Sequence, residues 1–192
     1  MKDIVREAMN SIKEYAAILK EANTKINLVS RQISDHELNQ LLDETILLND
    51  LISFETVIDA GSGNGLLGIP IAIINKNKKI ILVEPKQKKS SFLTEVKNRM
   101  NLANVEIVGV SLEEYLKKAN KKPCSLIARG FPNLAPLVSF VKKGLVKEAV
   151  IITSENKIKK NEKHLVSVKK KIYNVPLRTY LKILKMEKTD RE

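Results

Sequence analysis

Residues 56–68 read Thr56-Val57-Ile58-Asp59-Ala60-Gly61-Ser62-Gly63-Asn64-Gly65-Leu66-Leu67-Gly68, and this stretch decides the fold. It begins as a short, mostly apolar run, which is typical of a buried strand. Three glycines at alternate positions then allow a sharp turn and leave backbone N–H groups open to a ligand. Pro70 is tolerated only in the first turn of a helix, so a helix is expected to begin at Gly68 or Ile69.

A second apolar run, Ile80 to Val83, follows this helix and ends in Glu84. Two neighbouring strand ends, one with a bare loop and the other with a carboxylate, can hold an adenosine. The loop meets the backbone-like part of the ligand, and Glu84 accepts hydrogen bonds from the ribose hydroxyls. The two segments together predict a nucleoside-containing ligand.

The identity of this ligand depends on which glycines are counted. From Gly63 the chain reads G-x-G-x-x-G, the dinucleotide fingerprint, which leaves a nicotinamide-dependent reductase as an alternative. From Asp59 it reads D-x-G-x-G-x-G, the loop of S-adenosylmethionine-dependent methyltransferases. Asp59 would repel a pyrophosphate, whereas S-adenosylmethionine carries an ammonium and a sulfonium that an acid favours. The Asp59 interpretation is therefore preferred.

Composition indicates a globular protein of one domain with a small helical extension. The chain has 192 residues, of which 43% are hydrophobic and 29% charged. We place the extension at residues 1–52 and the ligand-binding domain at residues 53–192. No apolar stretch is long enough to span a bilayer and no signal-type segment opens the chain, so we expect a cytoplasmic protein without a membrane partner. Cys124 is the single cysteine and is expected to pack in the core.

The net charge of +12 favours a polyanionic partner, although a lysine-rich composition alone could produce it. Lys86, Lys88 and Lys89 directly follow Glu84, at the edge where the ligand is expected. Other lysines, including Lys121 and those between residues 157 and 163, are expected to lie in solvated helix ends and loops.

Periodicity predicts an N-terminal helix through Ile4 and Leu19, and a second helix that Ser34 and Glu37 open as a capping box. Strands are expected near 57–60, 80–84, 105–110, 125–129 and 149–153, with helices near 68–75, 88–101, 112–119 and 134–145. Apolar runs at 165–172 and 178–186, joined through Pro176, are predicted to form a closing β-hairpin. This order predicts an α/β fold with an open, mostly parallel, seven-stranded sheet covered on both faces.

Ligands on such sheets lie beyond the carboxyl ends of the strands, and this rule selects further residues. Leu112 and Glu113 follow the third strand and can flank an adenine ring, although Ser111 and Glu114 are explained equally well by a capping box. Arg129 closes the apolar fourth strand, where burial requires an anionic partner, either in a ligand or in a structural salt bridge.

The segment from Val57 to Glu114 resembles the small-subunit rRNA methyltransferase G family, also called glucose-inhibited division protein B, and the similarity extends over roughly residues 23–140. Several positions, among them Gln40, Leu67, Ser111 and Ser154, depart from the family pattern. The matching pieces are Asn23-x-Lys25-x-Asn27-Leu28, Asp59-x-Gly-Ser-Gly-x-Gly-Leu66 with Gly68-Ile69-Pro70, Glu84, Lys88 and Lys89 before Phe92-Leu93, Asn104-Val105-Glu106, Leu112-Glu113 and Arg129.

The resemblance implies a class I, Rossmann-like methyltransferase. It implies S-adenosylmethionine as the methyl donor and N7 of a guanine in small-subunit (16S) rRNA, free or in the 30S particle, as the acceptor. Guanine N7 has a lone pair and no proton, so the reaction requires no general base, and positioning supplies much of the acceleration. We therefore expect no catalytic acid or base and no metal. A divergent relative that binds RNA but has lost the activity is the other alternative.

Motif and resemblance together select two sets of candidate residues. Those for RNA, or for the methyl-transfer centre, are Asn27, Lys88, Lys89 and Arg129. Those for the cofactor are Asp59, Gly61, Ser62, Gly63, Gly65, Leu66, Glu84, Leu112, Glu113 and Arg129.

Overall fold

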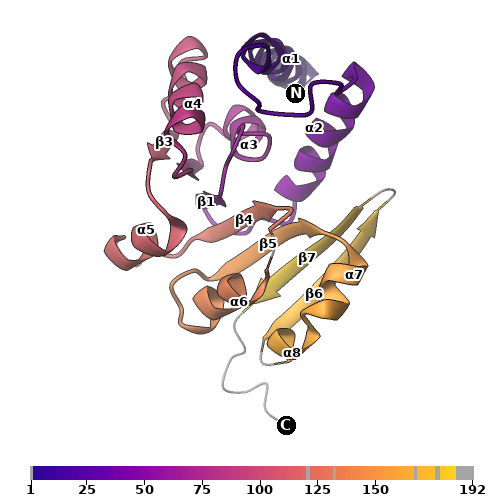
Figure 1. Ribbon diagram of the computed structural model, residues 1–192, viewed down its shortest axis with the longest axis vertical. Coiled ribbons are helices and arrows are strands. Elements are labelled where there is room, and N and C mark those ends of the chain that lie inside the picture. The colour runs from indigo at the N-terminus through magenta and orange to yellow at the C-terminus, as the bar shows by residue number, and fades with distance from the viewer. Residues whose placement is uncertain (1, 120–121, 132, 167, 176–177, 185–192) are drawn as a thin grey trace.

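A computed structural model describes every residue except 1, 120–121, 132, 167, 176–177 and 185–192. Its described strands form one seven-stranded sheet in the order β3-β2-β1-β4-β5-β7-β6 (Figure 1). Pairs from β3 to β5 are parallel, and β7 is antiparallel to both β5 and β6. The predicted mostly parallel sheet with a closing hairpin is confirmed. The strands are β1 (Thr56–Ala60), β2 (Lys79–Val83), β3 (Val105–Val108), β4 (Ser125–Arg129), β5 (Glu148–Thr153), β6 (Lys169–Val175) and β7 (Arg178–Leu184).

Helices cover both faces of the sheet, with α1 to α4 on one face and α5 to α8 on the other (Figure 1). Each layer has its own buried core, and alternate strand residues point into each, as Val57 and Ile58 of β1 do. The helices are α1 (Lys2–Asn23), α2 (Asp35–Asn49), α3 (Gly68–Ile74), α4 (Gln87–Arg99), α5 (Leu112–Lys118), α6 (Ala135–Lys142), α7 (Glu155–Lys160) and α8 (Glu162–Leu165).

Local signals account for where these helices begin. The capping box at α2 is present: Ser34 Oγ accepts from Glu37 N at 3.2 Å, and Glu37 Oε2 accepts from Ser34 N at 2.8 Å. Helix α3 begins at Gly68 with Pro70 in its first turn, as predicted. None of the helices in the described ranges is long and apolar enough to cross a bilayer.

The segment after β5 corrects the prediction. Two helices that were not predicted, α7 and α8, contain the lysines expected in helix ends and loops, and the strand expected from Leu165 begins only at Lys169. The hydroxyl of Ser154 accepts from Lys157 N and caps α7, while Ile158 and Leu165 are buried in the same core. The predicted hairpin connection at Pro176, its last residues 185–186, and Lys121 lie outside the described residues.

A buried carboxylate fixes the connection from α2 to β1. Glu148 Oε1 accepts from Ser53 N and from Ser125 Oγ, both at 2.7 Å, and Oε2 lies 2.9 Å from Lys182 Nζ. Burial raises the pKa of Glu148, but the hydrogen bonds from Ser53, Ser125 and Lys182 outweigh it, so the pKa is lowered overall. The carboxylate therefore stays charged and holds the linker, β4 and β7 together.

Candidate functional site

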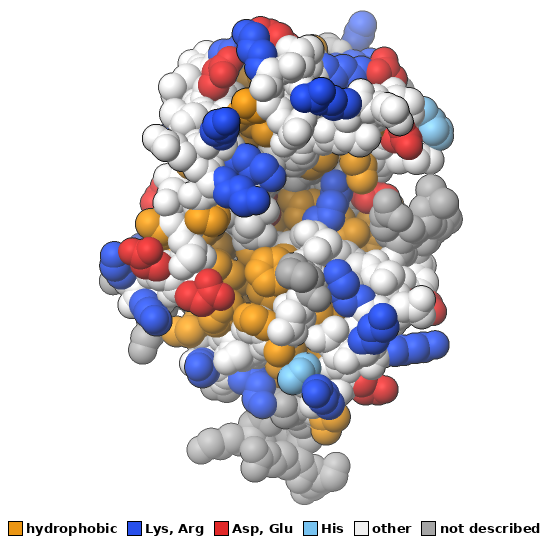
Figure 2. All heavy atoms as spheres, viewed as in Figure 1, with side chains coloured by type: hydrophobic (Ala, Val, Ile, Leu, Met, Phe, Trp, Pro, Cys, Tyr) orange, Lys and Arg blue, Asp and Glu red, His pale blue; other side chains and the backbone are white. Residues whose placement is uncertain are grey.

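A cavity of about 410 Å³ lies at the carboxyl edge of the sheet, where β1 and β4 adjoin and the strand order reverses. Open α/β sheets bind ligands at this switch point, in pockets of roughly 300–1,000 Å³. Figure 2 shows a hollow in the middle of the viewed face, with apolar side chains at its base and Lys or Arg side chains at its margin. Seven sequence candidates line the cavity together: Asp59, Gly61, Ser62, Gly63, Leu66, Lys89 and Arg129.

The glycines of the loop after β1 have different roles. Gly61 has φ +67°, and a Cβ atom there would meet no atom within 4 Å. Gly65 has φ +84°, but its Cβ atom would lie 2.7 Å from Ile69 Cγ1 and 2.8 Å from Leu93 Cδ2. Gly61 therefore leaves the loop open toward a ligand, whereas Gly65 permits close packing against α3 and α4.

Glu84 meets the glycine loop as the sequence predicts. The residue is 5% exposed; Oε2 accepts from Gly63 N and Oε1 from Lys86 N, both at 2.9 Å. Ser62 N also donates to Val83 O at 3.1 Å, which joins the loop to the end of β2. Because each carboxylate oxygen has two lone pairs, Glu84 retains capacity to accept from hydroxyl groups of a ligand.

Asp59 supplies negative charge beneath the loop. Its side chain is 1% exposed, and Oδ2 accepts from Gly68 N at 3.0 Å at the start of α3. Burial raises the pKa of Asp59 to about 7, against the hydrogen bond from Gly68 and the attraction of Arg129, which lower it. A cationic ligand group nearby favours the ionised form of this acid.

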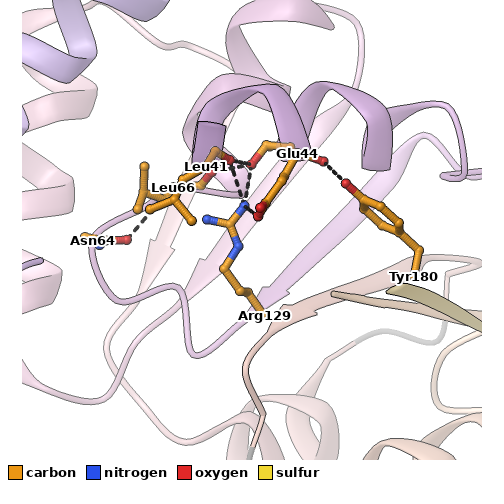
Figure 3. Close-up of polar contacts among 7 residues, drawn as sticks. Leu41, Glu44, Asn64, Leu66, Arg129 and Tyr180 are labelled. Atoms are coloured by element: carbon orange, nitrogen blue, oxygen red, sulfur yellow. Dashed lines mark hydrogen bonds and ion pairs between the residues drawn. The ribbon is translucent and has the colours of Figure 1, made fainter. Parts of the chain in front are cut away.

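Arg129 connects the end of β4 to α2 (Figure 3). Its Nη2 donates to Leu41 O at 2.8 Å and to Thr45 Oγ1 at 3.0 Å, and lies 3.7 Å from Glu44 Oε2. Burial lowers the pKa of Arg129, although Glu44 and Asp59 act in the opposite direction. Glu44 is thus the acidic partner of a structural salt bridge, one of the two expected alternatives.

Two further donors of Arg129 remain available. Nε and Nη1 are buried and have no hydrogen-bond partner among the described residues. Since Arg129 also lines the cavity, these groups are candidates for an acceptor on a bound ligand.

Six candidates do not line this cavity: Gly65 and Glu84, whose contacts with the loop are given above, and Leu112, Glu113, Lys88 and Asn27. Leu112 is buried and Glu113 exposed at the start of α5, on the same sheet edge but outside the cavity lining. Lys88 lines a separate groove of about 220 Å³ between α1 and α4. Asn27 is exposed in the loop from α1 to α2, and its Oδ1 accepts from Arg31 Nε at 3.1 Å.

The capping box expected at the start of α5 is only half formed. The hydroxyl of Ser111 accepts from Glu114 N at 3.1 Å. The carboxylate of Glu114 instead pairs with Lys118 at 2.8 Å, one helical turn further along α5.

Three polar residues that were not selected from the sequence hold the site to the N-terminal helices. The Tyr15 hydroxyl donates to Asn64 O at 2.7 Å, and Asn64 Nδ2 donates to Leu28 O at 2.9 Å. Thr45 Oγ1 lies 2.7 Å from Leu66 O, to which it donates, and 3.0 Å from Leu41 O. Thr45 and Tyr15 lie on apolar helix faces. A hydroxyl group on such a face needs a hydrogen-bond partner when it is buried, and this feature could have identified both residues from the sequence.

Residues 8–183 match the family described as rRNA small subunit methyltransferase G. A protein of that name from Brachyspira hyodysenteriae is 29% identical over 182 residues, covering 93% of this chain and 84% of its own. Another from Fusobacterium nucleatum is 29% identical over 219 residues, covering 100% of this chain and 94% of its own.

Solved structures agree in fold. An O-methyltransferase from Bacillus cereus in complex with SAH has a TM-score of 0.63 at 13% identity, covering 92% of this chain and 91% of its own. A precorrin-6y C5,15-methyltransferase from Geobacter metallireducens has a TM-score of 0.58 at 15% identity, covering 84% of this chain and 92% of its own. These likenesses support the methyltransferase fold.

Proposed function

Because the chain belongs to the rRNA small subunit methyltransferase G family, we infer that it transfers a methyl group from S-adenosylmethionine to small-subunit rRNA, at N7 of a guanine. The observation that carries this proposal is the cavity at the switch point, where a bare loop, a buried acid and Arg129 meet. The comparisons do not favour a nicotinamide-dependent reductase.

The residues of the cavity fit the cofactor. S-adenosylmethionine supplies a methyl group activated by a sulfonium. Gly61 leaves room for the cofactor at the loop, and Glu84 can accept hydrogen bonds from its ribose hydroxyls. Asp59 offers a carboxylate to a cationic group of the cofactor. We assign Leu112 and Glu113 to the adenine end because they begin α5 at the same sheet edge.

On the acceptor side the protein needs to position the base rather than move a proton. Lys89 and Arg129 line the cavity and provide positive charge for the RNA. The apolar side chains of Leu28, Val29 and Leu66 line the same cavity and can exclude water from the reacting atoms. Asn27 and Lys88 lie outside the cavity, so we assign them to RNA beyond the target nucleotide.

Transfer of a labelled methyl group to small ribosomal subunits from a strain without the family enzyme tests the function. Incorporation should require the wild-type protein and fall sharply in Glu84→Ala, because a lost charge-assisted hydrogen bond costs about 1.5–3 kcal/mol. The matched control is Glu106→Ala, which removes a half-exposed carboxylate of β3 that pairs with Lys79. Mass spectrometry of the treated rRNA then identifies the nucleotide and the methylated atom.

The possible outcomes separate the remaining alternatives. Retained RNA binding without incorporation by the wild-type protein would overturn the proposed activity in favour of a relative that only binds RNA. Equal losses in Glu84→Ala and Glu106→Ala would contradict the cofactor site. A methyl group on an atom other than guanine N7 would contradict the proposed acceptor.

A further inference from the structure

A second concave surface, the α6–α8 groove, carries positive charge away from the cofactor cavity. It has a volume of about 390 Å³ and is lined on two helices by Ser139, Lys142, Lys143, Lys163 and His164, with Ala135 and Val138. The three lysines are exposed and the histidine is half-buried. No acidic side chain lines this groove within the described ranges.

Ion pairing within the protein does not account for the positive charge of these lysines. In the part of the chain that the structure describes, Lys142, Lys143 and Lys163 form no ion pair. Lys118, at the end of α5, shows the contrast: it pairs with Glu114 one turn earlier at 2.8 Å. The residues one turn before Lys142 and Lys143 are Val138 and Ser139, which cannot neutralise them.

Compensation of helix dipoles accounts for only part of the charge. One cation at a helix C-terminus stabilises the helix by about 0.3–1 kcal/mol when exposed. Here the end of α6 and the short α8, separated in sequence but packed together, direct four basic groups into one groove. Such convergence of unpaired lysines on a concave surface fits an extended polyanion.

The groove lies on the same side of the molecule as the central hollow. Figure 2 shows Lys or Arg side chains and a histidine gathered over α6 and α8, below that hollow. Helix α7 is tied to the loop after β4, because Lys157 Nζ donates to Phe131 O at 2.8 Å, two residues beyond Arg129. RNA bound at the hollow therefore lies on the same side of the molecule as the groove.

We propose that the α6–α8 groove binds the phosphate backbone of the RNA substrate outside the target nucleotide. This inference rests on the proposed function and extends it by a second anchoring surface. The three lysines neutralise phosphates and Ser139 supplies a hydroxyl donor, whereas methyl transfer takes place in the cavity. Contacts of this kind fix the position of the RNA without reading its sequence.

The test compares two triple variants with the same change in net charge. The groove variant is Lys142→Gln/Lys143→Gln/Lys163→Gln, and the control is Lys13→Gln/Lys76→Gln/Lys117→Gln, at exposed positions elsewhere. Affinity for labelled small-subunit rRNA is measured against salt concentration, with S-adenosylmethionine affinity and thermal stability as further readouts. For the groove variant we expect the log–log slope to become shallower by up to about 2, at about 0.7 per phosphate. The KM for RNA should rise while kcat stays the same.

Equal slopes in the groove and control variants would overturn the proposal, because net charge alone would then explain RNA affinity. Loss of cofactor affinity in the groove variant would also contradict it, since the groove is separate from the cavity. If the wild-type protein binds RNA through the groove but transfers no methyl group, the proposed function is wrong and the proposal for the groove still holds.

Discussion

Asp59 combines complete burial with a titration near neutral pH. Its pKa is about 7 in the folded protein, so between its ordinary value of 3.8 and about 7 the folded state holds a proton that the unfolded state has released. The free energy of unfolding of the ligand-free protein therefore decreases as pH rises through this window and is constant above it. The three-unit difference corresponds to about 4 kcal/mol at most.

The first prediction follows from this titration. The wild-type protein should lose stability between pH 5 and pH 8, and Asp59→Asn should lose much less, because the amide cannot ionise. Chemical denaturation at both pH values measures the difference. Asp35→Asn, at an exposed position, serves as the control and should match the wild type. Parallel pH profiles for Asp59→Asn and the wild type would contradict the raised pKa.

Single residues show what the sequence could and could not predict about the site. The motif predicted that Gly61 and Glu84 meet a ligand at one edge of the sheet. In the structure Gly61 lies in the glycine loop and lines the cavity, and Glu84 accepts a hydrogen bond from Gly63 of the same loop. The packing role of Gly65 depends on Leu93, a contact between elements that local spacing does not encode. Lys88 and Lys89 are adjacent in sequence, but they line different surfaces because successive helix residues point about 100° apart.

At the scale of elements, α2 holds the glycine loop and β4 in place through Thr45. Its side chain is fully buried, and its hydroxyl accepts from Arg129 Nη2 and donates toward Leu66 O. The position of Arg129 at the cavity thus depends on a helix outside the catalytic sheet.

The second prediction tests this link. Thr45→Val preserves shape but removes the hydroxyl, so unfolding should become easier by about 1–3 kcal/mol. The affinity for S-adenosylmethionine should decrease as well. Thr45→Ser keeps the hydroxyl and should restore cofactor affinity even where the lost methyl group lowers stability. Equal cofactor affinities in the Val and Ser variants would show that the hydroxyl does not position the site.

Elements differ in how well they could be predicted. Those from β1 to β5 lie within a few residues of their expected bounds, because strands buried on both faces give continuous apolar runs. Helices α7 and α8 have six and four residues and few apolar positions. They contain too few turns for a helical period of apolar residues to be detected. Ile158 and Leu165 are buried because α8 packs against both α6 and α7, and these contacts are visible only in the tertiary structure.

At the scale of the whole molecule, the N-terminal extension belongs to one of the two cores. Ile12, Tyr15 and Leu19 of α1, with Leu38 and Leu48 of α2, are buried in the same cluster as α3 and α4. The division at residues 52 and 53 remains a prediction from the sequence. The shared core indicates that the two parts fold together.

The third prediction follows from this shared core. Residues 53–192 expressed alone should not fold cooperatively, because the apolar surface of α3 and the sheet would be exposed to water. Circular dichroism during heating, with the full chain as reference, measures this. A cooperative transition of the fragment at the melting temperature of the full chain would show that residues 53–192 fold without the extension.

The lysines at the start of β6 affect whether the sheets of two molecules can pair edge to edge. Lys169, Lys170 and Lys171 stand exposed on the last strand, whose outer side has no described neighbour, and β3 at the opposite end has only four residues. Copies of the lysine-rich β6 margin repel each other when two molecules meet. Edge-to-edge pairing of two β6 strands is therefore disfavoured.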